Sequence, residues 1–171
     1  IRNALAAAAR VNDVVVTIAG SSAGTRDLVP QAVEELGEVL VHGVDLMPGK
    51  PAVLGLIERK PLAGLPGYPV SAWVAADTFL KPLVFHMLGL DPPSRARLRG
   101  VLSQDLVSRL GMEELVRVHL SQHESGWTVT PLPRGAGLIT SLIRADGILR
   151  IPPDLEGLNE GAEVEVELMD G

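Results

Sequence analysis

The sequence contains no cysteine and few aromatic residues, and each absence limits the chemistry available to the protein. Without cysteine there are no disulfides, no thiolate metal sites and no cysteine nucleophile. This lack is compatible with a reducing compartment, and we expect a cytoplasmic protein. Aromatic residues make up 3% of the chain and hydrophobic residues 46%. The core must therefore consist mostly of Val, Leu, Ala and Ile.

The sequence also lacks a long apolar run and an excess of basic charge. No stretch of about 18 apolar residues occurs, so we expect no transmembrane helix and no membrane partner. The net charge of −6 and the pI of about 5.2 disfavour a nucleic-acid partner, because nucleic-acid binders present a basic face. An initiator Met is missing as well, and the first five residues read like the middle of a helix. We therefore expect a segment of a longer parent protein.

The first half of the sequence alternates between helix-like and strand-like segments. The Ala-rich stretch 1–10 favours a helix, and the β-branched run 14–18 is typical of a strand buried on both faces of a parallel sheet. Further strands are predicted at 39–44, 52–57 and 62–65, and helices at 28–36 and 70–88, the latter kinked or divided at Pro82. This alternation predicts an α/β domain over residues 1–91, with a parallel-type sheet and helices.

The pattern changes after a linker around residues 91–94. Residues 117–121 and 127–132 alternate between apolar and polar side chains, and Glu124-Ser125-Gly126 between them is typical of a hairpin turn. Further strands are predicted at 148–151 and 164–168. We therefore expect residues 95–171 to form a compact all-β domain.

The loop Gly20-Ser21-Ser22-Ala23-Gly24 separates a predicted strand from a helix that Asp27 is suited to cap. Its small residues let backbone N–H groups approach an anion, and the dipole of the following helix favours negative charge. The loop is therefore a candidate phosphate site. The alternative is an ordinary strand-to-helix turn with a capping Asp.

Two further loops could take part in the same chemistry. In Pro48-Gly49-Lys50-Pro51, two prolines fix the direction of Lys50, which suits contact with a phosphate; a solvated surface lysine is the alternative. In Pro66-Gly67-Tyr68-Pro69, rigid backbone joins a strand to a helix, and a plain turn is the alternative. Because ligands of α/β sheets lie at the carboxyl ends of strands, we expect the three loops to converge on one cradle.

The four histidines, at positions 42, 86, 119 and 123, do not have the spacing of a metal site. The last two are four residues apart, but in a predicted strand or hairpin rather than on one face of a helix. We interpret all four as structural or surface residues. No Ser-His-Asp set can be assembled.

In this combination the motifs resemble the MoeA family (molybdopterin molybdenumtransferase, gephyrin E-domain-like). The matching segments of the first half are, in order, Asp13–Thr17, the Gly20–Gly24 loop with Asp27, Pro48-Gly49-Lys50-Pro51, Leu65-Pro66-Gly67 and Pro69-Val70-Ser71-Ala72. Those of the second half are Arg117-Val118-His119-Leu120, Ser141–Gly147 and Glu160–Val166. The resemblance covers nearly the whole chain. It implies a truncated MogA-like domain at 1–91 and the family's β-barrel-like C-terminal domain at 95–171.

The resemblance also implies a function and a set of site residues. Family members insert molybdate into adenylylated molybdopterin, using magnesium and releasing AMP, and they form homodimers. The implied cofactor-binding residues are Gly20, Ser21, Ser22, Gly24, Lys50, Pro66, Gly67, Pro69 and Ser71. Asp27 matches the family's functional acidic residue, in catalysis or magnesium binding. We expect the fragment alone to be inactive, because the N-terminal half of the α/β domain is absent, and we expect the sheet edge left without those strands to favour association.

Two residues depart from the family pattern. Ala19 stands where the family has a glycine, and a methyl group there narrows the space for a ligand and disfavours positive φ. Tyr68 stands where the family has an asparagine, which replaces an amide by a ring. These departures leave an alternative open: a non-catalytic module of a MoeA-like fusion protein that senses molybdopterin or molybdate, or serves as a scaffold.

Overall fold

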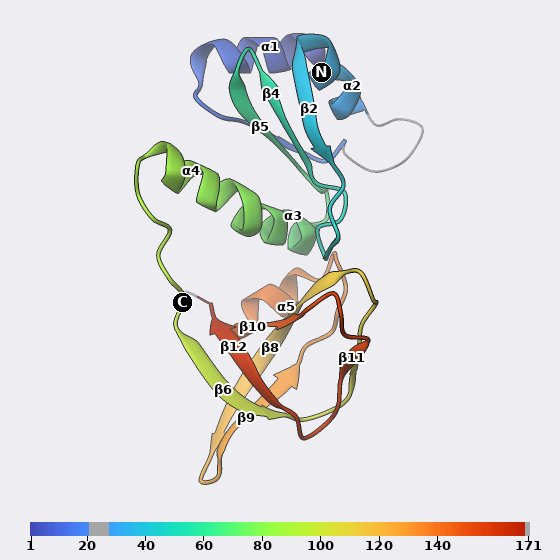
Figure 1. Cartoon of the computed structure of the whole chain (residues 1–171), viewed down its shortest axis with the longest axis vertical. Helices are drawn as coiled ribbons and strands as arrows, with labels where there is room; N and C mark the ends of the chain where they lie inside the picture. Colours follow the sequence, from blue (N-terminus) through green and yellow to red (C-terminus); the bar gives the residue numbers. More distant parts are fainter. Residues whose placement is uncertain (21–27, 170–171) are drawn as a thin grey trace. The chain divides into compact units, whose positions relative to one another are not determined.

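The computed structural model describes residues 1–20 and 28–169. The chain divides into two compact units, drawn in Figure 1. We call residues 1–44 and 49–92 the α/β unit, and residues 45–48 and 93–171 the β unit. The segment 45–48 thus interrupts the α/β unit in sequence but belongs to the other one. In the described part of the chain, no helix is long and apolar enough to cross a membrane.

The α/β unit consists of a four-stranded sheet with helices. Its strands are β1 (Val15–Ile18), β2 (Gly37–His42), β4 (Val53–Ile57) and β5 (Lys60–Leu65). Its helices are α1 (Arg2–Val11), α2 (Leu28–Leu36), α3 (Pro69–Ala75) and α4 (Lys81–Met87), with the π-helical turn η1 (Ala76–Leu80) between the last two. The strand order is β1-β5-β4-β2. The predicted α/β class of this unit is therefore confirmed.

The direction of the strands corrects one expectation from the sequence. Only β1 and β5 run parallel, whereas β4 is antiparallel to both β5 and β2. Glu58 and Arg59 form the turn between β4 and β5, both at positive φ. A connection of two residues can join only antiparallel strands, because a parallel pair needs a long crossover. The sheet is therefore mixed, not parallel.

Apolar side chains cover both faces of this sheet. One face packs on α1 and α2, through Leu5, Ala9, Val15, Val29, Ala32, Val33, Ile57 and Leu62. The other packs on α3 and η1, through Ala52, Ala63, Leu65 and Ala75 with Leu54, Ala72 and Phe79 beside them. The prediction that β1 is buried on both faces is wrong, since Val15 is buried but Ile18 is 68% exposed. Among the described residues β1 pairs with β5 alone, so it lies at an edge.

The predicted long helix at 70–88 is divided as Pro82 requires. Proline has no N–H to donate and its ring crowds the carbonyl four residues earlier, so a regular α-helix cannot continue through it. The chain accommodates this with the π-helical turn η1, in which the Lys81 N–H donates to the carbonyl of Ala76, five residues back. Pro82 then lies in the first turn of α4, where no N–H is needed.

The β unit is built around a closed barrel of five strands. The barrel strands are β6 (Arg97–Leu102), β8 (Glu113–His123), β9 (Gly126–Pro131), β10 (Gly147–Ile151) and β12 (Glu163–Leu168). The order β10-β12-β6-β9-β8 closes because β8 pairs back onto β10. Smaller elements are β3 (Leu46–Met47), β7 (Leu106–Val107), α5 (Ile139–Ile143) and β11 (Gly157–Leu158). The predicted barrel-like fold is therefore confirmed.

Alternation along the barrel strands fills the interior. The buried interior residues are Leu102, Leu106, Val116, Val118, Val129, Leu149, Ile151, Val164 and Val166. The predicted hairpin is present, since β8 and β9 pair from His123 opposite Gly126 to Val118 opposite Pro131. The segment 45–48 joins this unit because β3 adds to β8 as a parallel neighbour.

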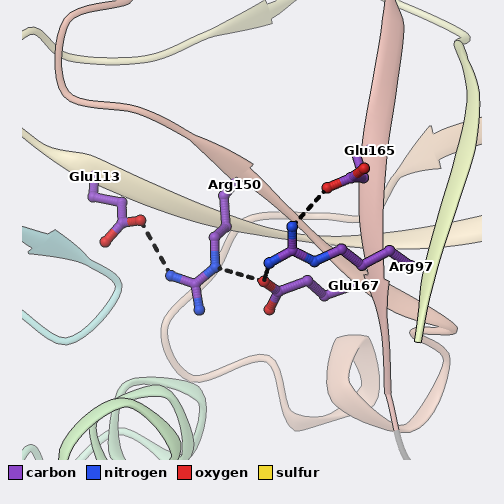
Figure 2. A network of polar contacts seen from close by, with 5 residues as sticks. All are labelled: Arg97, Glu113, Arg150, Glu165 and Glu167. Carbon is purple, nitrogen blue, oxygen red and sulfur yellow. Dashed lines mark hydrogen bonds and ion pairs between the residues drawn. The ribbon is translucent and has the colours of Figure 1, made fainter. Parts of the chain in front are cut away.

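Charged side chains on the barrel strands form a connected network (Figure 2). Glu167 on β12 lies 3.4 Å from both Arg97 on β6 and Arg150 on β10. Arg97 also contacts Glu165 at 2.9 Å, and Arg150 contacts Glu113 on β8 at 3.1 Å. Burial lowers the pKa of Arg150, but Glu167 and Glu113 outweigh it and leave that pKa raised. The network therefore links four barrel strands through opposite charges.

Arg117 on β8 is a buried cation that the sequence did not single out as such. Its side chain is 1% exposed, and burial lowers its pKa. Nε donates to Ser141 Oγ at 3.1 Å and Nη2 donates to the carbonyl of Pro133 at 3.0 Å. Ser141 Oγ in turn donates to the carbonyl of Leu138 at 2.6 Å. Arg117 thereby holds α5 and the segment before it against the barrel.

Candidate functional site

The predicted loops meet at one end of the strands in the sheet of the α/β unit. β1 and β5 are parallel and end together, with Ile18 opposite Leu65, so the loops that follow them start side by side. β4 starts at this same end of the sheet, because Val53 lies opposite Gly64 near the end of β5. The Lys50 loop leads directly into β4. The backbone topology thus brings the start of the first loop, the Lys50 loop and the third loop to the same end of the strands.

The first and third loops are in direct contact. The Ala19 N–H donates to the carbonyl of Leu65 at 2.9 Å, which extends the β1–β5 pairing by one bond. A Cβ added to Gly67 would come within 3.0 Å of the Ala19 Cβ, closer than ordinary van der Waals contact. Gly20 has φ +80, and its carbonyl accepts from the Val29 N–H at 3.4 Å, which ties the loop to the start of α2.

Ala19 corrects a second expectation. The methyl group was expected to disfavour positive φ, yet Ala19 adopts φ +68. For a residue with a Cβ, this left-handed conformation costs about 1 kcal/mol. The turn therefore keeps the backbone path that a glycine would take. The methyl group adds bulk where Gly67 approaches.

The Lys50 loop has a backbone held by hydrogen bonds and an exposed lysine side chain. The Val44 N–H donates to the Lys50 carbonyl at 2.9 Å, and the Ala52 N–H donates to the Gly49 carbonyl at 3.1 Å. The Lys50 side chain is exposed at this end of the strands. An exposed ammonium on a backbone held by hydrogen bonds fits both interpretations, an anion contact and a plain surface lysine.

The third loop divides into buried and exposed residues. Pro66 is buried, and Ser71 in the first turns of α3 is 5% exposed. Gly67, Tyr68 and Pro69 between them are exposed. Pro66, Val70 and Ser71 thus support the loop from within, while Gly67, Tyr68 and Pro69 form its outer surface.

The remaining predicted site residues, Ser21, Ser22, Gly24 and Asp27, lie outside the described residues. The structure places Gly20, Lys50, Gly67 and Pro69 at the same end of the strands, and it buries Pro66 and Ser71. Among the described residues, no three His, Cys, Asp or Glu side chains are grouped as a metal site would need.

Sequence reasoning did not include Tyr68 among the site residues, although it lies in the middle of the third loop. It also did not foresee that His119 Nδ1 contacts Asp146 Oδ2 at 2.6 Å. The Leu120 N–H donates to the same oxygen at 2.8 Å. This pair lies in the β unit, and both side chains are about half exposed. It ties the start of β10 to β8.

Comparison with known families finds a match for each half of the chain. Residues 1–86 match the family described as "Probable molybdopterin binding domain", and residues 99–169 match the "MoeA C-terminal region (domain IV)". A relative from Methanocaldococcus jannaschii, named for molybdopterin biosynthesis, is 34% identical over 99% of this chain and 39% of its own length. Molybdopterin molybdenumtransferase 2 from Mycobacterium tuberculosis is 31% identical over 90% of this chain and 39% of its own length.

Solved structures give the same result for the fold. A MoeA protein of molybdopterin biosynthesis from Pyrococcus horikoshii is 37% identical, with a TM-score of 0.79 over 99% of this chain and 40% of that one. A molybdenum cofactor biosynthesis protein from Pyrococcus furiosus is 30% identical, with a TM-score of 0.73 over 98% of this chain and 53% of that one. The chain thus spans about two fifths of the length of the curated relatives it matches. It belongs to the MoeA family, as a molybdopterin-binding domain followed by the family's C-terminal region.

Proposed function

We propose that this chain provides the molybdopterin-binding unit of a protein that inserts molybdate into adenylylated molybdopterin. The strongest support is that three loops, those at Ala19, Lys50 and Gly67, meet at one end of the strands. Relatives named molybdopterin molybdenumtransferase match 90% or more of this chain. These names favour an enzyme over the sensing or scaffold alternative.

The proposed substrate carries its negative charge on phosphate groups, and the loop residues suit that charge. In the sequence, Gly20 begins a loop of small residues that precedes α2, and backbone N–H groups in such a loop would suit that charge. Lys50 is an exposed ammonium on a backbone held by hydrogen bonds. Donors that are already in place stabilise charge without reorganisation. Gly67 and Pro69 would form the facing wall, supported by Pro66 and Ser71.

Magnesium, when bound, would neutralise phosphate charge. We assign its protein ligand to Asp27, because magnesium prefers carboxylate oxygen and keeps several waters and substrate phosphates in its shell. Ser21, Ser22 and Gly24 would line the phosphate side. We further propose that activity requires upstream domains of the parent chain, that the parent works as a homodimer, and that it works in the cytoplasm.

Binding of a phosphorylated pterin, measured by calorimetry, tests the proposal. Wild type should bind, and Lys50→Ala should weaken binding about five- to tenfold, equivalent to about 1 to 1.4 kcal/mol. Lys60→Ala is the matched control, because Lys60 begins β5 at the opposite end of the strands and donates to the Asn12 carbonyl. Equal affinities of wild type and Lys50→Ala would remove Lys50 from the site.

Catalysis needs a separate measurement on the full-length parent. Given adenylylated molybdopterin and molybdate, the parent should release AMP steadily, and Asp27→Ala should abolish this while leaving the fold intact. The isolated 171-residue chain should release none. Steady AMP release by the isolated chain would contradict the need for upstream domains.

A further inference from the structure

Tyr68 is an exposed aromatic residue at the end of the strands where the three loops meet. Its side chain is 66% exposed, although the residues that follow it, Val70 and Ser71, are buried at 0% and 5%. It lies directly after Gly67, which touches Ala19, and directly before Pro69, which begins α3. A tyrosine in this place leaves most of an aromatic ring in water next to the residues of the proposed site.

The backbone that presents this ring is fixed. Tyr68 has φ −80 and ψ 131, and its carbonyl accepts from the Ala72 N–H at 2.8 Å. Pro69 fixes the next φ, and the close approach of Gly67 to Ala19 limits movement on the other side. A tyrosine side chain has only two rotatable angles, so ordering it against a ligand costs little conformational entropy.

The spacing of the strands suits one ligand that contacts both Lys50 and Tyr68. Tyr68 follows β5, and Lys50 precedes β4, the antiparallel neighbour of β5. The loop at Ala19 follows β1 on the other side of β5. Neighbouring strands are about 4.8 Å apart, so the three loops together span about 10 Å. Tyr68 follows the middle one of these three strands, one strand spacing from Lys50, so a small molecule that carries a flat ring and a phosphate can reach both.

We propose that Tyr68 is a specificity-determining residue of this site and that its ring stacks on a flat nitrogen heterocycle of the substrate. The inference rests on the proposed function, and it adds recognition of the ring to recognition of the phosphate. Both the pterin and the adenine of an adenylylated pterin have this chemistry. Stacking accepts any heterocycle with a π-face, so the two rings are distinguished by the choice of probe.

Two substitutions separate the π-face from bulk and from the hydroxyl group. Tyr68→Leu keeps an apolar side chain but removes the π-face, and Tyr68→Phe keeps the π-face. The probes are a phosphorylated pterin, AMP and inorganic phosphate, with dissociation constants measured by calorimetry. Tyr68→Leu should weaken binding of the stacking probe about 5- to 100-fold. Tyr68→Phe should stay within about twofold of wild type, and phosphate affinity should not change in either variant.

Each outcome decides the inference. If Tyr68→Leu affects only the pterin probe, the ring stacked is the pterin; if it affects only AMP, it is the adenine. If Tyr68→Leu binds both probes as wild type does, the inference is wrong, while the proposed function stands as long as Lys50→Ala weakens binding. If wild type binds neither heterocycle, both are wrong. Thermal unfolding checks that the exposed substitution leaves the fold unchanged.

Discussion

Gly67 lies against the methyl group of Ala19, so closely that a Cβ on Gly67 would be 3.0 Å from the Ala19 Cβ. Gly67→Ala should therefore destabilise the protein by about 1 to 3 kcal/mol through overpacking. Ala19→Gly should stabilise it by up to about 1 kcal/mol, because it removes the strain of φ +68. In the double variant the methyl groups no longer collide, so the cost of Gly67→Ala should fall by about 1 kcal/mol.

Urea unfolding of the four proteins in this cycle measures the coupling. Gly89→Ala is the control: Gly89 has φ +68 and nothing within 4 Å of an added Cβ, so its cost comes from the backbone alone. Combined with Ala19→Gly, it should be additive within about 0.5 kcal/mol. Additivity of Gly67→Ala with Ala19→Gly would show that positions 19 and 67 are not in contact.

Arg117 is expected to contribute more to stability than any surface arginine of the barrel. Arg117→Ala leaves a cavity and removes the donors to Ser141 Oγ and the Pro133 carbonyl, so we expect a loss of about 3 to 5 kcal/mol. Arg99 is the matched control on β6. Its side chain is 83% exposed and lies 3.9 Å from Glu165, so Arg99→Ala should cost at most about 0.5 kcal/mol. Denaturant unfolding that ranks the two equally would contradict this role for Arg117.

Glu167 is the shared partner of Arg97 and Arg150 in the barrel network (Figure 2). Its side chain is 17% exposed, whereas both arginines are partly solvated, so the effect of Glu167→Gln should be modest, about 1 kcal/mol. The loss should shrink in about 1 M salt, where the screening length is about 3 Å. Glu163→Gln, on an exposed position of the same strand, should change stability by less than about 0.5 kcal/mol at either salt concentration. A loss for Glu167→Gln that is unaffected by salt would indicate packing rather than charge.

The elements that local chemistry determines were predictable from the sequence. α2 occupies Leu28–Leu36 as expected, and the division of the helix at Pro82 follows from a missing N–H. The β8–β9 hairpin follows from alternation on both sides of a short turn. Strand direction was not predictable in the same way, because apolar periodicity is the same in parallel and antiparallel strands. The Glu58-Arg59 turn contained that information in its length.

Properties that depend on distant neighbours were beyond the sequence. Nothing local distinguishes Arg117, which is buried, from Arg99, which is solvated; only the segments that pack over β8 decide it. Residues 45–48 likewise belong to the β unit because β3 pairs with β8. For the candidate site, the order of the loops was readable, but the contact between Ala19 and Gly67 required the β1–β5 register.

The edge of β1 leads to a last prediction, about association of the isolated chain. Among the described residues β1 pairs only with β5, and it exposes Ile18 at 68%. An unpaired, apolar edge strand is a template for another strand. The opposite edge strand, β2, exposes Leu40 at 55% but has a bulge between Val39 and Val41, which protects an edge. We therefore expect concentration-dependent association through β1 rather than β2.

Sedimentation velocity of three proteins tests this expectation. Ile18→Lys should shift the isolated chain towards monomer, because a charge on the edge opposes strand pairing and the apolar side chain is lost. Leu40→Lys removes a similarly exposed apolar residue from the other edge and should leave association unchanged. Equal effects of the two substitutions would mean that exposed apolar area, not the open edge of β1, drives association. A monomeric wild type at all concentrations would show that this edge does not pair.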